Sequence, residues 1–352
     1  MWVSDGTGLD IVIFVAGYRH SMKVTVLGGG SWGTTVASLV SRHHDTVLWA
    51  RDASVVDEIN VHHRSSGYLP GFTLSDQLRA TSVLSEAAQH AELLIVGVPT
   101  QGFRAVLEVA KHDVRPWIPA ISLSKGLEAG TLLRMTQVLK EVLPGRPAAT
   151  LTGPNLAREI MAGQAAASVI ATEDLEVADA LQSVLQTGLL RVYTNHDVIG
   201  CELGGALKNV IAIASGMAQG LGVGDNTRAG VMTRGLAELT RLGVAMGGEA
   251  STFAGLTGMG DLVATCMSPS SRNRQVGEQL GRGRPLQDIL DEMNMVAEGV
   301  KTAVTVHELA TRHGVPMPVC DTIRRVILGE LTAVDAYRGL RRQSAGHEAD
   351  PG

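Results

Sequence analysis

Lys208 lies within an apolar helical pattern and is the first residue of this chain whose type and position suggest chemistry. The surrounding segment, residues 202–214, reads Glu-Leu-Gly-Gly-Ala-Leu-Lys-Asn-Val-Ile-Ala-Ile-Ala. Its apolar residues recur at helical spacing on one face, namely Leu203, Leu207, Val210, Ile211 and Ala214. Lysine is almost never fully buried without a partner, and a site that lowers its pKa makes it a proton donor or acceptor. Lys208 is either such a group or a lysine whose stem extends to the surface.

A glycine-rich turn precedes this helix by some 170 residues. Residues 28–33 read Gly-Gly-Gly-Ser-Trp-Gly, directly after a strand-like run at 23–27 and before a helix-compatible run at 31–42. Gly28, Gly30 and Gly33 fit the G-x-G-x-x-G spacing in the strand–turn–helix context that this motif requires. Such glycines allow a tight turn and a close approach of the backbone to a dinucleotide pyrophosphate. The alternative is a glycine-rich turn without a ligand.

The end of the second expected strand, residues 46–49, carries the residues that would select the cofactor. In NAD-specific folds an acidic residue binds the adenosine ribose at about this place. Here Arg51 comes first and suits the 2′-phosphate of NADP(H), because a guanidinium binds phosphate with two parallel hydrogen bonds. Asp52 follows and suits NAD(H). The sequence therefore favours NADP(H), and NAD(H) stays open.

Strand-like and helix-like segments alternate from residue 23 to about residue 195. Further strands are expected at 92–98 and 117–123, and helices at 131–143 and 175–186. This alternation predicts an α/β fold with a doubly wound, Rossmann-type parallel sheet. Beyond residue 195 the pattern is helical, most clearly at 199–218, 228–246, 298–313 and 318–328. We therefore expect an extension at 1–21, a dinucleotide-binding domain at 22–195, an all-helical domain at 196–335 and a flexible tail at 336–352.

Composition and charge exclude several classes of protein. The formal charge of −5 gives no basic surface for nucleic acid. The three cysteines are far apart and fit neither a metal site nor a disulfide framework, which favours a reducing cytoplasm. The apolar run at 11–16 is too short to span a membrane and follows acidic residues instead of a basic region. We expect no metal, no membrane insertion and no nucleic-acid partner.

Three further motifs accompany the glycine turn and the lysine helix. They read Ser-Leu-Ser-Lys-Gly-Leu-Glu at 122–128, Leu-Thr-Gly-Pro-Asn-Leu-Ala at 151–157, and Gly-Met-Gly-Asp-Leu-Val-Ala-Thr at 258–265, the last followed by Ser-Arg-Asn-Arg at 271–274. In this combination the chain resembles the bacterial-type NAD(P)-dependent glycerol-3-phosphate dehydrogenases over about residues 22–335. The resemblance implies reversible reduction of dihydroxyacetone phosphate to sn-glycerol 3-phosphate, which supplies glycerophospholipid synthesis.

The resemblance also assigns roles to residues of this chain. It implies that Lys208 is the general acid and base, that Lys125 holds the substrate or polarises its carbonyl, and that Asp261 orients the Lys208 ammonium. Read without it, Lys125 would be a solvated turn residue and Asp261 a turn residue that caps a helix. The other residues that it places at the substrate are Gly153, Asn155, Ser271, Arg272 and Asn273.

The phosphate and the nucleotide account for the remaining residues. Ser271, Arg272 and Asn273 offer hydroxyl, guanidinium and amide donors that suit a phosphate dianion, although an exposed basic turn is the simpler interpretation. For the cofactor, the resemblance implies contacts with Gly28, Gly30, Ser31, Trp32, Gly33, Arg51, Lys125, Ala157, Arg272, Val296 and Glu298. The chain departs from the family at Trp32, where Phe or Tyr is common, and at Asn155, where Thr or Ser is common. A homodimer is the family expectation.

Two other functions compete with this interpretation. The 6-phosphogluconate and β-hydroxyacid dehydrogenases share the two-domain plan, but they carry Lys-x-x-x-Asn, whereas here Asn209 follows Lys208 directly and the fourth residue onward is Ala212. A non-catalytic redox sensor that binds a dinucleotide would not need to retain all four of the residues Lys125, Lys208, Asp261 and Arg272. Neither competitor fits the four motifs as a set.

Overall fold

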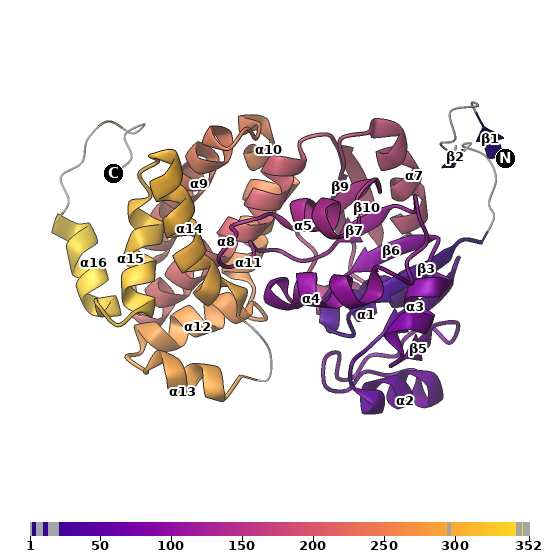
Figure 1. Cartoon of the computed structure of the whole chain (residues 1–352). Coiled ribbons are helices and arrows are strands. Elements are labelled where there is room, and N and C mark those ends of the chain that lie inside the picture. The colour runs from indigo at the N-terminus through magenta and orange to yellow at the C-terminus, as the bar shows by residue number, and fades with distance from the viewer. Residues whose placement is uncertain (1, 5–9, 13–20, 294–296, 343–346, 348–352) are drawn as a thin grey trace. The chain divides into compact units, whose positions relative to one another are not determined.

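The computed structural model of the protein describes residues 2–4, 10–12, 21–293, 297–342 and 347. By its internal contacts the chain forms two compact units, and we describe each by itself (Figure 1). The first comprises residues 1–124 and 135–198, and the second comprises residues 125–134 and 199–352. Residues 125–134 thus belong with the helices that follow them much later in the sequence. The domain limits given above stay a prediction, since compactness alone does not define where a functional domain ends.

An eight-stranded sheet forms the centre of the first unit. Its strands are β3 (Lys23–Leu27), β4 (Asp45–Trp49), β5 (Arg79–Thr81), β6 (Leu93–Val96), β7 (Ala120–Ser122), β8 (Ala148–Thr152), β9 (Ala166–Ala171) and β10 (Leu190–Asn195). They lie in the order β10-β9-β8-β7-β6-β3-β4-β5. The strand order reverses between β3 and β6, the place where doubly wound sheets bind dinucleotides. A separate antiparallel pair, β1 (Trp2–Ser4) with β2 (Asp10–Val12), precedes the sheet.

The sheet is parallel, as expected, at every pairing except that of β8 with β9, which is antiparallel. The connection between these two strands contains α6 (Ala157–Met161), a helix of five residues. Such a helix is about 7.5 Å long, whereas β8, also of five residues, spans about 17 Å. The helix is therefore too short to carry the chain back along the strand, as a parallel crossover requires. Gly153 (φ 116°) and Gly163 (φ 85°) supply the left-handed conformations at which the chain reverses instead.

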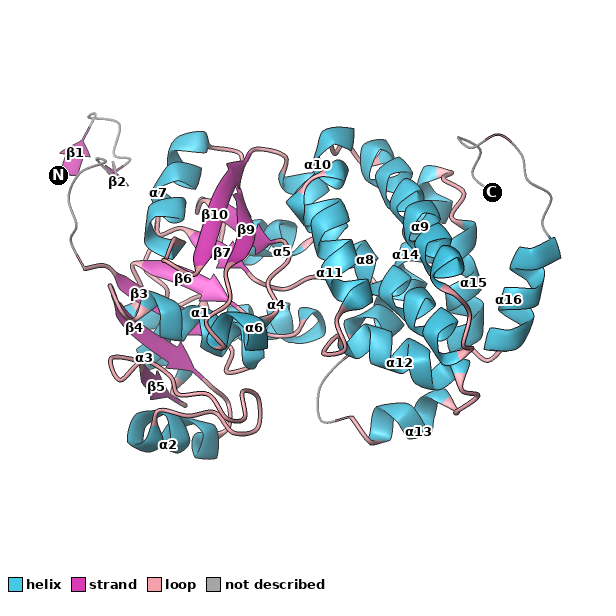
Figure 2. Cartoon of the chain, turned by 180° about the vertical axis from the view of Figure 1, so that it is seen from behind, coloured by secondary structure: helices cyan, strands magenta, loops and turns pink. Residues whose placement is uncertain are grey.

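Helices cover both faces of this sheet (Figure 2). They are α1 (Ser31–Val40), α2 (Ala53–His62), α3 (Leu84–His90), α4 (Thr100–Ala110), α5 (Met135–Val142), α6 and α7 (Leu175–Leu185). Helix α1 packs with α6 and α7, while α4 packs with α3 and α5. Every residue of β6 is buried, as expected of a parallel strand with helices on both sides.

The second unit is helical, and its described residues contain no strand beyond one isolated bridge between Leu127 and Arg134. Its helices are α8 (Val198–Gly220), α9 (Asp225–Ala245), α10 (Ala250–Ala254), the π-helical turn η1 (Leu256–Gly260), α11 (Asp261–Met267), α12 (Arg272–Gly281), α13 (Leu286–Asp291), α14 (Glu298–His313), α15 (Pro318–Ile327) and α16 (Ala333–Arg342). Helix α8 lies at the centre of this unit. By its length and composition alone, it could cross a membrane. Its most apolar stretch is 94% buried inside the protein, so it is a core helix.

Glycines on α8 and α12 bring the backbones of these two helices into direct contact. A Cβ atom at Gly216 would lie 2.0 Å from the carbonyl oxygen of Arg274, and one at Gly277 would lie 2.0 Å from that of Ile213. Gly220 and Gly281 repeat this relation one helical turn further along. No side chain fits at such distances, so the orientation of α12, and with it that of residues 271–274, depends on glycine at these positions.

We predict that Gly277→Ala lowers the free energy of unfolding by roughly 1–3 kcal/mol, because the added methyl group collides with the α8 backbone. Gly230→Ala is the matched control. Gly230 is an exposed position within α9 where a Cβ atom would meet nothing within 4 Å, so alanine there should stabilise the helix by roughly 0.5–1 kcal/mol. Chemical denaturation of both variants measures the difference. Equal stabilities would show that the two helices can separate without loss.

Candidate functional site

The glycine turn between β3 and α1 has the geometry of a dinucleotide-binding loop. Gly28 has φ 125°, and a Cβ atom there would lie 2.7 Å from the Gly97 backbone. At Gly33 a Cβ atom would lie 2.1 Å from the Gly28 carbonyl oxygen, whereas at Gly30 it would meet nothing within 4 Å. Gly30 is the N-cap of α1, and no described side chain caps the helix. The first turn of α1 therefore presents its amides to an anion, which fits a pyrophosphate.

Ser31 and Trp32 follow on the first turn of α1. The Ser31 hydroxyl donates to the carbonyl oxygen of Tyr68 at 3.0 Å, which ties the loop to residues 65–72. The half-buried Trp32 ring packs against the hydrophobic core of the first unit, and its indole nitrogen is buried. Both side chains are therefore held by the protein itself beside the glycine turn.

Arg51 and Asp52 differ in what they do at the end of β4. Asp52 is the N-cap of α2, and its carboxylate accepts hydrogen bonds from the Ser54 amide at 2.9 Å and the Ser54 hydroxyl at 2.8 Å. These hydrogen bonds hold the pKa of Asp52 below its usual value, and the bond from the hydroxyl has the larger effect. Arg51 is exposed. The carboxylate thus serves the fold, and the guanidinium faces solvent.

Gly153, Asn155 and Ala157 lie within five positions at the carboxyl end of β8. A Cβ atom at Gly153 would lie 3.2 Å from the Ser168 Cα atom and 3.3 Å from the Ala167 carbonyl oxygen, in a backbone conformation that already favours glycine. Asn155 is half-buried in the loop, and Ala157 begins α6 and packs against the core of the first unit.

In the second unit, one buried carboxylate accepts hydrogen bonds from two lysines. The Lys208 ammonium donates to one oxygen of Asp261 and, at 2.8 Å, to the hydroxyl of Thr265. The Lys125 ammonium donates to the other oxygen of Asp261 at 2.9 Å. The side chains of Lys208 and Asp261 are 5% and 3% exposed, so Lys208 does not extend to the surface. Asp261 therefore lies where it can orient the Lys208 ammonium, and that role stays a prediction.

Burial sets the protonation of Lys208. Removal from water lowers the pKa of its ammonium to about 8, and the charge of Lys125 acts in the same direction. The Asp261 carboxylate opposes this by favouring the charged form. A lysine with a pKa near 8 exchanges its proton close to neutral pH, where an ordinary lysine stays charged.

The π-helical turn η1 places Asp261 opposite Lys208. A Cβ atom at Gly258 would lie 2.1 Å from the Phe253 carbonyl oxygen, so only glycine fits inside this turn. On α8, a Cβ atom at Gly204 would lie 2.7 Å from the Thr257 carbonyl oxygen. The turn therefore rests directly on the α8 backbone one helical turn before Lys208. Asp261, the first residue of α11, then meets the lysine. π-helical turns of this kind are frequent at functional sites.

A chain of amide hydrogen bonds connects Lys125 with α8, α12 and α14. The Asn209 side-chain amide donates to the Lys125 carbonyl oxygen at 3.3 Å, and that of Asn273 donates to the Asn209 side-chain oxygen at 3.0 Å. The Gly299 amide donates to the Asn273 side-chain oxygen at 3.0 Å. Asn209 and Asn273 are both buried. The Asn273 side chain thus points into the unit, and its expected contact with substrate phosphate stays a prediction.

Ser271, Arg272 and Glu298 lie at the N-terminal ends of two helices of the second unit. Ser271 is the N-cap of α12, and its hydroxyl accepts from the Arg274 amide at 3.3 Å. Arg272 follows it, is exposed, and is attracted electrostatically by the carboxylate of Glu298 at the start of α14. Val296 lies outside the described residues.

Two polar residues of this site, Thr265 and Asn209, were missed as site residues by the sequence analysis. Thr265 follows Asp261 by four positions, so the two share one face of α11. That spacing was a usable signal. Asn209 directly follows Lys208 and was used only to exclude another family, because its partners come from distant segments.

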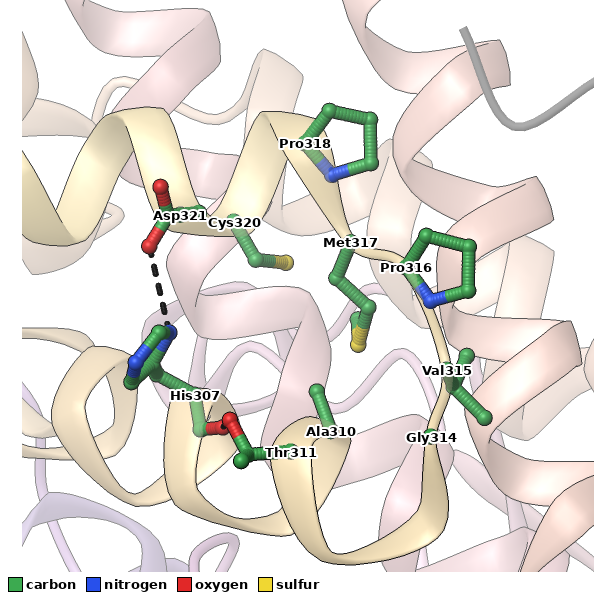
Figure 3. A pocket seen from close by; sticks show the side chains of 10 residues that line it. All are labelled: His307, Ala310, Thr311, Gly314, Val315, Pro316, Met317, Pro318, Cys320 and Asp321. Carbon is green, nitrogen blue, oxygen red and sulfur yellow. Dashed lines mark hydrogen bonds and ion pairs between the residues drawn. The ribbon is translucent and has the colours of Figure 1, made fainter.

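A cavity of about 460 Å³ lies elsewhere in the second unit, between α14 and α15 (Figure 3). Across it His307 and Asp321 face each other, with 3.1 Å between imidazole nitrogen and carboxylate oxygen. The residues that line it include none that the sequence analysis expects at the substrate or cofactor.

Comparisons with known proteins cover almost the whole chain. Residues 23–178 match the family described as NAD-dependent glycerol-3-phosphate dehydrogenase N-terminus, and residues 197–338 match the corresponding C-terminus. A glycerol-3-phosphate dehydrogenase (NAD(P)+) of Sphingopyxis alaskensis is 60% identical over 331 residues, which are 94% of this chain and 99% of the relative. One from Mycobacterium avium is 52% identical over 95% of this chain and 98% of its own. The crystal structure of the Coxiella burnetii glycerol-3-phosphate dehydrogenase has 32% identity and a TM-score of 0.87, over 92% of this chain and 99% of that one.

We predict that Asn273→Ala lowers the free energy of unfolding by roughly 1–3 kcal/mol, because the Gly299 amide and the Asn209 side chain each lose a buried partner. Gln275→Ala is the control on the same helix, since Gln275 is exposed and bonds only locally, to the Pro269 carbonyl oxygen. Denaturant unfolding of both variants measures the effect. An Asn273→Ala protein of wild-type stability, with only a raised KM for substrate, would place Asn273 at the phosphate instead.

Proposed function

Since the chain belongs to the NAD-dependent glycerol-3-phosphate dehydrogenase family, we propose that Lys208 is the general acid and base of its reaction. The enzyme reduces dihydroxyacetone phosphate to sn-glycerol 3-phosphate, reversibly and with NAD(P)H. The bound nicotinamide supplies the hydride that the carbonyl carbon accepts. The carbonyl oxygen becomes a hydroxyl and needs one proton, which the Lys208 ammonium donates. In the oxidative direction the neutral amine takes this proton back.

The observation that carries this proposal is the buried contact of Lys208 with Asp261 and Thr265. The carboxylate and the hydroxyl fix the direction of the ammonium, so it meets the substrate oxygen in one orientation. Its lowered pKa, about 8, makes the proton available near neutral pH. Lys125 binds the other oxygen of the same carboxylate, and its ammonium stabilises negative charge that develops on the substrate oxygen.

We assign the recognition of the substrate phosphate to Arg272, together with Ser271 and the first turn of α12. An exposed guanidinium at a helix N-terminus suits a phosphate dianion, because the helix dipole adds to the arginine charge. The carboxylate of Glu298 attracts Arg272 electrostatically. As the family resemblance implies, we assign Gly153 and Asn155 to the substrate. The nucleotide is assigned to Ala157, Val296 and Glu298.

The choice of cofactor is assigned to Arg51. Asp52 caps α2, and one oxygen of its carboxylate receives both hydrogen bonds from Ser54. The cap thus gives Asp52 a role in the fold, whereas the exposed Arg51 is available to bind a 2′-phosphate. NADPH is therefore the preferred reductant in this proposal.

The cellular setting follows the family expectation. The enzyme acts as a cytoplasmic homodimer and supplies glycerol 3-phosphate for glycerophospholipid synthesis. Its three cysteines are buried free thiols, which agrees with a reducing compartment.

We predict that Lys208→Ala lowers kcat with dihydroxyacetone phosphate by roughly two to four orders of magnitude, because the positioned acid is lost. Binding of NADPH, measured by fluorescence titration, should be unchanged, since the glycine turn that receives the nucleotide is intact. A Lys208→Ala enzyme that turns over at near-wild-type rates would exclude Lys208 as the proton donor.

The lowered pKa of Lys208 predicts opposite pH profiles for the two directions. Reduction needs the ammonium, so its kcat/KM should be constant below about pH 8 and fall above it. Oxidation needs the neutral amine, so its kcat/KM should rise up to about pH 8 and then level off. Steady-state assays from pH 6 to pH 10 in both directions measure these limbs. If kcat/KM changed with pH in the same direction for reduction and oxidation, the assignment would be contradicted.

We predict that Arg51→Ala raises the KM for NADPH more than that for NADH, because only NADPH carries the phosphate. Loss of a charge-assisted hydrogen bond is worth roughly 1.5–3 kcal/mol, or about 10- to 100-fold in KM. Kinetics with both cofactors on the wild type and the variant test this. A wild-type preference for NADH that the variant keeps would reverse the assignment in favour of Asp52.

A further inference from the structure

The segment 125–134 is a compact turn that starts with Lys125 and ends with Arg134. Leu127 and Arg134 form an antiparallel bridge, and within the turn the Leu132 amide donates to the Glu128 carbonyl oxygen at 2.9 Å. Leu127 and Leu132 are buried in the hydrophobic core of the helical unit. The turn is therefore a rigid unit, so a contact that holds Arg134 in place also holds Lys125 in place.

Both ends of this turn attach to α8. At its beginning, Asn209 donates to the Lys125 carbonyl oxygen. At its end, the Arg134 guanidinium donates to the Glu202 carboxylate at 2.5 Å. Glu202 and Asn209 are seven residues apart, two turns of the helix, so they lie on the same face and about 10 Å from each other. The turn thus lies along α8 and is held at two points.

The ion pair at the second point is buried. The side chains of Arg134 and Glu202 are 13% and 5% exposed. A surface ion pair contributes little and tolerates movement, whereas a buried one loses much if its partners separate, because each charge is then desolvated and unpaired. The pair therefore permits only one placement of the turn on α8.

We propose that Arg134 and Glu202 are positioning residues of the reaction: their buried ion pair holds the Lys125 turn on α8 so that the Lys125 ammonium stays on Asp261. This inference rests on the proposed function of Lys208 and Lys125. Arg134 and Glu202 act through Lys125, whose ammonium lies 2.9 Å from the carboxylate that also binds Lys208.

This arrangement links the ion pair to a measurable property of Lys208. The titratable groups that face the Lys208 ammonium are Asp261 and Cys266 of α11 and Lys125 of the turn. The positive charge of Lys125 lowers the pKa of Lys208, while Asp261 raises it. A turn that is no longer held on α8 lets Lys125 withdraw, and the pKa of Lys208 then rises.

Arg134→Met in the full-length enzyme tests this, with Arg324→Met as the matched control. Arg324 is a similarly buried arginine of the second unit, 17% exposed, and pairs with Asp321 on α15. For Arg134→Met we expect kcat/KM for dihydroxyacetone phosphate to fall roughly 10- to 100-fold. The alkaline limb of reduction should move upward by up to about one pH unit, and the KM for NADPH should not change. Arg324→Met should leave the limb and the rates as in the wild type.

A double variant separates positioning from a general loss of structure. Lys125→Met should move the limb upward by itself, and Arg134→Met added to it should move the limb no further, because the charge that the ion pair places is already absent. If Arg134→Met does not fold, Glu202→Gln takes its place, since it keeps the size of the side chain and removes only the charge. Arg134→Lys, which retains the charge, should restore part of the activity.

The proposal is overturned if Lys125→Met moves the limb and Arg134→Met, or Glu202→Gln, does not. It is also overturned if the shifts add in the double variant, since Arg134 would then act by another route. Failure of the proposed function would give a different result. Lys208→Ala would remain active, and the wild type would show no alkaline limb near pH 8.

Discussion

The second unit depends on the burial of the Lys208 ammonium inside a helix core. An isolated cation in such a place would lose its proton or destabilise the fold by several kcal/mol, so a carboxylate must be held within hydrogen-bond distance. Asp261 is that carboxylate, and the segment that brings it must lie directly on α8. The same burial lowers the pKa of the lysine, because Asp261 compensates only part of the cost of removing the ammonium from water.

Close approach of this kind explains an unusual feature of the composition. The chain has 41 glycines and only 3% aromatic residues. Around α8, glycine lies at several places where another segment crosses the helix, as Gly204 does against η1 and Gly216 against α12. On α9, Gly235 would direct a Cβ atom to 2.7 Å from the Ile211 side chain. Backbone contacts of this kind hold the polar groups of the core at well-defined distances.

Much of this architecture could be predicted from the sequence, because local patterns determine it. The apolar runs of β3 and β6, the glycine turn before α1 and the long periodic helices α8 and α14 are all defined by neighbouring residues. The antiparallel direction of β9 could not be predicted. It depends on the shortness of α6 and on the φ angles of glycines, which a sequence does not display. The attachment of residues 125–134 to the helical unit was hidden for another reason. It depends on contacts with α8, more than 60 residues away. Of the candidate site, the motifs identified the lysines and Asp261, whereas the partners of Asn273 required the fold.

Helix capping decides which polar residues of the candidate site can serve a ligand. Asp52 and Ser271 cap α2 and α12, and each accepts a hydrogen bond from a backbone amide through one side-chain oxygen. Each has an exposed arginine as its neighbour, Arg51 and Arg272. A cation near a helix N-terminus is opposed by the helix dipole, and a nearby carboxylate, Asp52 for Arg51 and Glu298 for Arg272, attracts each arginine. α1 presents the same kind of end, without a carboxylate in its first turn. A bound anion would relieve each of these positions, and a phosphorylated ketone and a dinucleotide both carry phosphate groups of the required charge. The electrostatic cost that the folded chain carries at these helix ends is therefore the physical counterpart of its preference for phosphorylated ligands.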